Sequence, residues 1–90
     1  MKTINWTKAK LEQKRKILVS YGTINGMNIV LHKDFIFFLD RKLNLVSYDP
    51  ISKANPAIKS EKFEVIEKLP KIAMKDIEGA LQIQELKGKK

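Results

Sequence analysis

The dipeptide Asn25-Gly26 is the feature that most constrains how this chain folds. A two-residue type I′ turn requires positive φ at both central positions, and Asn and Gly tolerate that conformation best. Because β-branched and aromatic residues flank the pair, we expect a β-hairpin in which Ile24 faces Met27 and Gly22 faces Ile29. One face of this hairpin is nearly all apolar and is predicted to be core: Leu18, Gly22, Ile24, Met27, Ile29 and Leu31. The opposite face is mixed in polarity, so we expect it to be only partly buried.

Two further strands are expected after the hairpin. They span Phe35 to Leu39 and Leu43 to Tyr48, and polar turns at 32–34 and 40–42 separate them. Strands joined in sequence by short turns form an antiparallel meander. Residues 49–62 contain two prolines and several Ser, Asn and Lys residues, so they are predicted to form a long loop.

Both ends of the chain carry helical signals. Residues 6–15 are good helix formers without Gly or Pro, and Asn5 is a suitable N-cap. For residues 63–67 we favour a strand over a helix that starts after Asn55-Pro56, because Phe, Val and Ile suit a pleated surface. For residues 74–86 the alternation around Leu81 favours one helical turn at 74–78 and then a closing strand. The alternative is a C-terminal helix.

This layout resembles the small SH3-like or Sm-like barrels, and the resemblance is one of layout alone. The predicted fold is mainly β: such a barrel, or a strongly bent meander of about five strands, with an N-terminal helix. The alternative is an α+β antiparallel meander with one or two C-terminal helices. A chain of 90 residues buries roughly 60–65% of its unfolded surface, which suits one domain over 1–90.

The composition indicates the cellular compartment in which we expect the protein. There is no cysteine, so packing must replace disulfides, and the longest apolar run, Phe35 to Leu39, is five residues. That run is too short for a membrane span or a signal peptide. We therefore expect a cytoplasmic protein without a membrane partner.

The positive charge is confined to the two ends of the chain. Of the net +8, residues 1–16 carry +5 and residues 87–90 carry +3, while residues 17–86 are neutral. Basic ends can bind a polyanion through phosphate contacts, and they can also serve only as solvated tails. The binding interpretation predicts a module that contacts RNA or single-stranded DNA largely independently of sequence. The residues predicted to make these contacts are Trp6, Lys8, Lys10, Lys14, Arg15, Lys16, Lys87, Lys89 and Lys90. Trp6 either docks the helix on the body or is a stacking partner, and docking is favoured because the helix has few other anchors.

Nothing in the sequence indicates catalysis. His32 is the only histidine, and there is no nucleophile elbow, P-loop or dinucleotide fingerprint around it. We predict a non-enzymatic protein with no metal or cofactor. The aromatic residues of the strands, among them Phe35 and Phe37, are interpreted as core and not as a base-stacking platform.

A second functional class competes with nucleic-acid binding. The neutral, aromatic-rich body also suits a protein-interaction module, such as a subunit, an adaptor or a small inhibitor. Such a module would dock on an acidic protein surface or pair through an exposed strand edge. It could also be a homo-oligomer whose second sheet face is buried by another copy.

Overall fold

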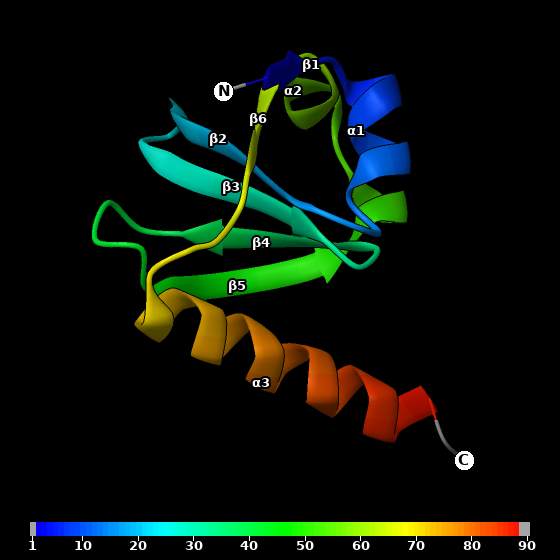
Figure 1. Cartoon of the computed structure of the whole chain (residues 1–90), viewed down its shortest axis with the longest axis vertical. Helices are drawn as coiled ribbons and strands as arrows, with labels where there is room; N and C mark the ends of the chain where they lie inside the picture. The colour runs from blue at the N-terminus through cyan, green and yellow to red at the C-terminus, as the bar shows by residue number, and fades with distance from the viewer. Residues whose placement is uncertain (1, 89–90) are drawn as a thin grey trace.

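An antiparallel sheet with helices on both faces organises the part of the chain that the computed structural model describes, residues 2–88 (Figure 1). Its strands are β1 Lys2–Ile4, β2 Ile17–Ile24, β3 Met27–His32, β4 Phe35–Leu39, β5 Leu45–Pro50 and β6 Phe63–Ile66. Its helices are α1 Trp6–Glu12, the 3₁₀ turn η1 Ile51–Lys53, α2 Pro56–Lys59 and α3 Lys71–Gly88.

The strand order across the sheet is β1-β6-β2-β3-β4-β5, and every neighbouring pair is antiparallel. The last four strands in this order, β2 to β5, are the predicted meander. The expected barrel is not confirmed, because β1 and β5 are the two edges of a sheet that does not close. The fold is therefore a mainly antiparallel sheet with an N-terminal helix and a C-terminal helix. Strand β1 was not expected from the sequence.

The hairpin forms at Asn25-Gly26 with both residues at positive φ, and Ile24 pairs with Met27 as predicted. Farther from the turn the predicted register is wrong, because Ser20 and not Gly22 pairs with Ile29. Between Ser20 and Ile24 strand β2 contains two more residues than the facing part of β3, and Gly22 sits there at φ +62°. A bulge of this kind bends the strand and places glycine where a side chain is strained.

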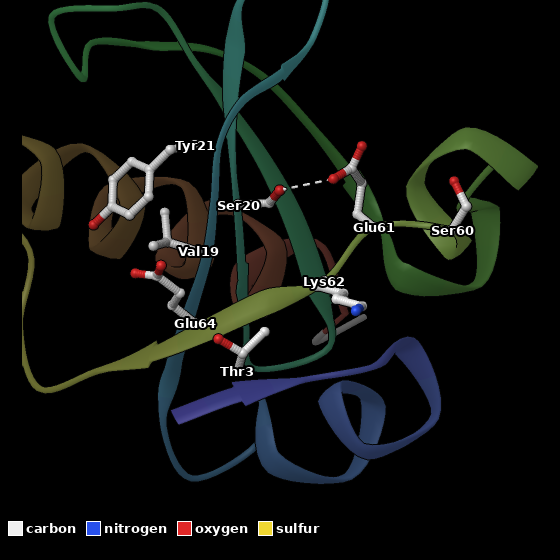
Figure 2. Close-up of a pocket in the computed structure, with 8 residues that line it drawn as sticks. All are labelled: Thr3, Val19, Ser20, Tyr21, Ser60, Glu61, Lys62 and Glu64. Atoms are coloured by element: carbon white, nitrogen blue, oxygen red, sulfur yellow. Dashed lines mark hydrogen bonds between the residues drawn. The ribbon is translucent and has the colours of Figure 1, made fainter. Parts of the chain in front are cut away.

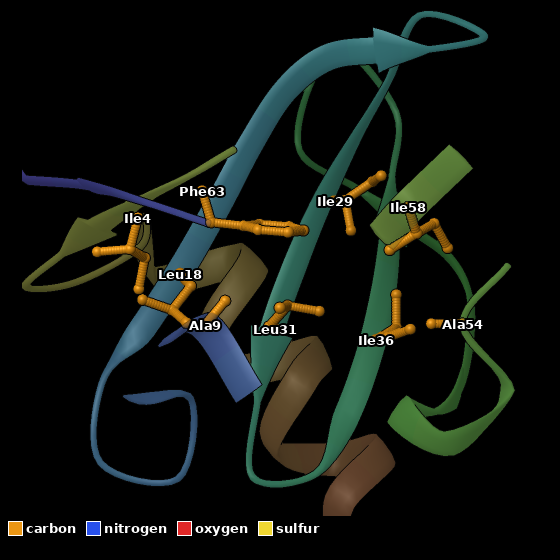
Figure 3. Close-up of a cluster of buried hydrophobic side chains, with 9 residues drawn as sticks. All are labelled: Ile4, Ala9, Leu18, Ile29, Leu31, Ile36, Ala54, Ile58 and Phe63. Carbon is orange, nitrogen blue, oxygen red and sulfur yellow. The ribbon is translucent and has the colours of Figure 1, made fainter. Parts of the chain in front are cut away.

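Each face of the sheet carries its own core. On one face α1 and α2 pack over a cluster that Figure 3 shows: Ile4, Ala9, Leu18, Ile29, Leu31, Ile36, Ala54, Ile58 and Phe63. On the other face α3 packs over a second cluster: Ile17, Val19, Val30, Phe37, Leu39, Leu69, Ala73, Ile77 and Ala80. The expectation that this second hairpin face is only partly buried holds at the exposed Tyr21 and the half-buried His32, but Val19 and Val30 are completely buried. Helix α3 covers Val19 and Val30, whereas the sequence favours a closing strand for part of that segment.

The predicted loop at 49–62 contains regular structure. Strand β5 runs on to Pro50, and η1 and α2 follow it. Asn55 caps α2, because its side-chain oxygen accepts a hydrogen bond from the Ile58 amide at 3.0 Å. The Asn55-Pro56 signal therefore does start a helix, which ends at Lys59 before the strand favoured for residues 63–67 forms as β6.

The preferred prediction for residues 74–86 is wrong, because these residues belong to α3 and not to a closing strand. Helix α3 lies beside edge strand β5 and buries Ala73, Ile77 and Ala80 against the sheet (Figure 1). The predicted basic tail begins inside this helix at Lys87, and Lys89 and Lys90 lie outside the described residues. Within residues 2–88 no helix has both the length and the apolar character needed to cross a membrane.

Candidate functional site

Helix α1 is held on the sheet at its start. The Asn5 side chain accepts a hydrogen bond from the Lys8 amide at 3.1 Å, which satisfies one of the free donors at the helix N-terminus. The Trp6 ring lies 6.1 Å from the Phe63 ring, and Ala9 is completely buried. Trp6 thus docks the helix, as favoured from the sequence, and the remaining side chains of α1 face outward.

Gln13 holds the other end of α1 in place. It is almost completely buried, and its side-chain amide donates to Lys10 O at 3.2 Å and to Asp34 Oδ1 at 3.0 Å. Its side-chain oxygen accepts from the Asp34 amide, and its carbonyl accepts from the Lys33 amide at 2.9 Å. Gln13 therefore ties the end of α1 to the turn between β3 and β4, which fixes the direction of the basic segment 14–16.

A hollow of about 500 Å³ opens where this basic segment meets the β1–β6 edge. Its lining combines three cations, one carboxylate and three apolar side chains: Lys2, Arg15, Lys16, Glu67, Ile17, Val65 and Ile66. Lys2 reaches it from β1, where it pairs with Val65. Positive side chains over an apolar floor suit a phosphate group with its attached sugar or base.

Few carboxylates neutralise these cations. Among residues 2–88 the one ion pair joins Lys16 Nζ to Glu12 Oε2 at 3.9 Å, on the exposed surface. Lys8, Lys10 and Lys14 are exposed on and just after α1, and Arg15 is exposed beside the hollow. We call these residues, together with Lys2 and Lys16, the basic surface. Its six cations carry a net charge of +4 after Glu12 and Glu67 are counted.

The structure brings together only some of the predicted contact residues. Arg15 and Lys16 line one hollow, and Lys8, Lys10 and Lys14 are exposed on and just after α1. Lys87 is exposed in the last turn of α3, a helix on the opposite face of the sheet from α1.

Two residues of the site were not predicted. Lys2 comes from the short strand β1, whose only strand partner, β6, lies about sixty residues along the chain. Gln13 stands within a basic run, and nothing local distinguishes it from a solvated residue.

Phe35, Phe37 and Tyr48 pack in the core, as interpreted from the sequence, whereas Tyr21 is exposed. The rings of Phe35, Phe37 and Tyr48 lie 5.9 to 6.4 Å from one another in the cluster below α3. The Tyr48 hydroxyl accepts a hydrogen bond from the Gln84 side chain of α3 at 3.1 Å. Tyr21, 51% exposed, is an isolated ring on β2.

His32 lies at the margin of the basic surface. Its Nδ1 is 3.4 Å from the Lys16 carbonyl oxygen. Burial lowers the pKa of His32, and Lys33 lowers it further, while the contact with Lys16 O and the charge of Glu78 oppose the shift. The described residues contain no group of three or more carboxylate or histidine side chains placed to hold a metal ion.

A second hollow lies where β2 and β6 diverge (Figure 2). Ser20 Oγ donates to Glu61 Oε2 at 3.1 Å across this fork. Figure 2 shows Glu61 on one side of β2, and Glu64 and Tyr21 on the other. Because the two carboxylates point to different sides of the strand, they do not form one cation site, although Glu64 Oε2 is buried without a hydrogen-bond partner.

Comparisons with protein-family models, with curated proteins and with solved structures find no match to this chain.

Proposed function

We propose that this chain is a small non-enzymatic module that binds RNA or single-stranded DNA through phosphate contacts. The basic surface makes these contacts. The lysines Lys87, Lys89 and Lys90 add to them where the nucleic acid reaches the C-terminal end of the chain. The observation that carries the proposal is the set of exposed cations around α1, of which only Lys16 has a carboxylate partner within residues 2–88.

The geometry supports phosphate contacts more than base contacts. Exposed lysines and one arginine around a hollow can neutralise a backbone and release its counterions. Phe35, Phe37 and Tyr48 are packed below α3, and Trp6 is docked against Phe63, which leaves Tyr21 as the one strand aromatic that is more than half exposed among the described residues. Phosphate contacts position a strand without identifying its bases, so sequence preference is expected to be weak.

The test is fluorescence anisotropy with the full chain and labelled mixed-sequence RNA and DNA single strands, at low and near-physiological salt. We expect binding at low salt that weakens steeply as salt rises, with similar affinity for unrelated sequences. Absence of binding even at low salt would show that the basic surface does not recognise nucleic acid.

A protein-interaction role is a second candidate, because α3 exposes large apolar side chains. Ile72, Ile83 and Leu86 are 69%, 50% and 72% exposed. Single exposed apolar residues are ordinary, but three on one helix beside an open sheet edge indicate a contact surface.

A further inference from the structure

The exposed apolar residues of α3 lie on one side of the helix. Ile72, Gly79, Ile83 and Leu86 are spaced by seven, four and three residues, which places them within a narrow arc at 100° per residue. The buried residues Ala73, Ile77 and Ala80 lie about 115° away around the helix, toward the sheet. An ordinary surface helix has one apolar stripe, so this second stripe requires its own explanation.

An open hollow of about 530 Å³ lies between this stripe and edge strand β5. Leu45 and Tyr48 line it from the sheet, and Gly79 and Ile83 line it from the helix. A Cβ added at Gly79 would meet no atom within 4 Å, so there is room for a side chain from another molecule.

Charge shows which molecule can cover this stripe. Helix α3 carries three lysines and three acids, so it is neutral in a chain of net charge +8. Two copies that met through their basic surfaces would repel each other, but two copies that meet through α3 avoid that repulsion. A membrane surface fits less well, because a helix that lies on lipid has a basic polar face, and here acids alternate with the lysines.

We propose that the outer face of α3 is the interface of a homodimer in which the two helices pack antiparallel about the Gly79-Ala80 step. In this arrangement Ile83 of each copy enters the hollow beside Gly79 of the other. Leu86 of one copy lies near Ile72 of the other. A two-fold interface of this kind needs self-complementary residues, and these pairings provide them.

The charges beside the stripe agree with the antiparallel orientation. Asp76 and Lys87 lie on one flank, so each Asp76 faces Lys87 of the partner copy, and in the dimer Lys87 pairs with this carboxylate in place of a phosphate. A parallel pair would instead bring the two Asp76 carboxylates to the same level. Edge strand β5 is not the main contact, because its register shift at Val46 and its terminal Pro50 discourage strand pairing.

The inference specifies the partner of the interaction surface described above and does not depend on nucleic-acid binding. Light scattering during size-exclusion chromatography of the full chain should give twice the 10.4 kDa mass of one copy at high concentration. Ile83→Glu should raise the dimer dissociation constant at least about tenfold, because it places a charge in an apolar contact. Leu11→Glu is the matched control, since Leu11 is an exposed apolar residue on α1, away from α3, and its dimer should remain.

Cysteine cross-linking tests the orientation, and the chain has no cysteine of its own. Ile72→Cys and Leu86→Cys lie about 21 Å apart on one helix, at 1.5 Å per residue. A mixture of the two single variants should form a disulfide-linked heterodimer on mild oxidation, while each variant alone should not link to itself. A strictly monomeric protein, an unchanged Ile83→Glu dimer, or self-linking of Ile72→Cys would each overturn the proposal.

Discussion

Removal of Arg15 and Lys16 together tests the basic surface quantitatively. Each phosphate contact to a single strand contributes about 0.7 to the slope of log affinity against log salt. Arg15 has no carboxylate partner among the described residues, whereas Lys16 is 3.9 Å from Glu12 and contributes the smaller share. Arg15→Gln with Lys16→Gln should therefore make the slope shallower by about 1 to 1.4, which is a loss of up to roughly 25-fold in affinity at 0.1 M salt.

The chain contains a matched control for this double variant. Arg41 and Lys42 are also an adjacent Arg-Lys pair in a turn, and both are exposed. This pair follows the C-terminal end of β4. The turn at Lys33, which is hydrogen-bonded to Gln13, precedes the N-terminal end of β4. Arg41→Gln with Lys42→Gln changes the net charge equally and should change the slope by less than about 0.3.

The assay is anisotropy titration of a labelled single strand at several salt concentrations, with circular dichroism to confirm that both variants are folded. Equal losses in the two double variants would show that net charge alone, and not the basic surface, determines affinity. An unchanged slope for the Arg15 and Lys16 variant would remove these two residues from the contact.

Three further predictions concern stability. Phe63→Ala removes a completely buried ring that supports Trp6 and should cost about 3–5 kcal/mol in urea unfolding, much more than the exposed substitution Leu11→Ala. Gly22→Ala should cost about 1 kcal/mol, because φ is +62° there and no neighbouring atom obstructs a Cβ; a cost near zero would contradict the bulge geometry. Burial lowers the pKa of His32 in the folded chain, so stability should be fully present above pH 6.5, the ordinary pKa, and decrease as the pH falls below it. His32→Gln should remove this decrease from a series of thermal melts.

The meander could be predicted from the sequence because its signals are local. Asn25-Gly26 fixes the turn, and the strands beside it follow from β-formers and polar turns. The register beyond Ser20 could not be predicted, since the bulge at Gly22 forms where β2 leaves β6, a strand more than forty residues away. Strand β1 depends on the same distant partner.

Helix α3 could not be predicted for a different reason. Its apolar residues lie on two sides of the helix, with Ile77 toward the sheet and Ile83 toward solvent. The sequence therefore shows no single apolar stripe with helical spacing. Gly79 inside the segment also argues against a helix. Packing over the cluster around Val30 and Phe37 decides its conformation.

The candidate site was predicted in part for related reasons. Arg15 and Lys16 follow from the charge distribution, which the sequence shows directly. Lys2 joins them only because β1 pairs with β6, and Gln13 positions them only because the turn at Lys33 and Asp34 lies beside it. Cations can therefore be counted in a sequence, but the surface they share depends on contacts across the chain.

The sheet separates the two proposed surfaces, and their separation makes a further test. Helix α1 and the basic surface lie on one face, and α3 lies on the other, so a dimer through α3 presents two basic surfaces to one long strand. One copy is 36 Å long, and at roughly 3.4 Å per nucleotide a strand of about 40 nucleotides exceeds the length of two copies, whereas about 10 nucleotides reach one.

Binding both surfaces at once raises apparent affinity without new contacts. Ile83→Glu should therefore weaken binding to the 40-nucleotide strand by at least about tenfold and leave binding to the 10-nucleotide strand unchanged. A long strand offers more binding positions than a short one, and this raises the measured affinity of the native chain and of the variant equally. The ratio of the two affinities on each strand therefore does not depend on strand length for this reason. An equal loss on both strands would mean that Ile83 affects the basic surface itself, and the two surfaces would then not be independent.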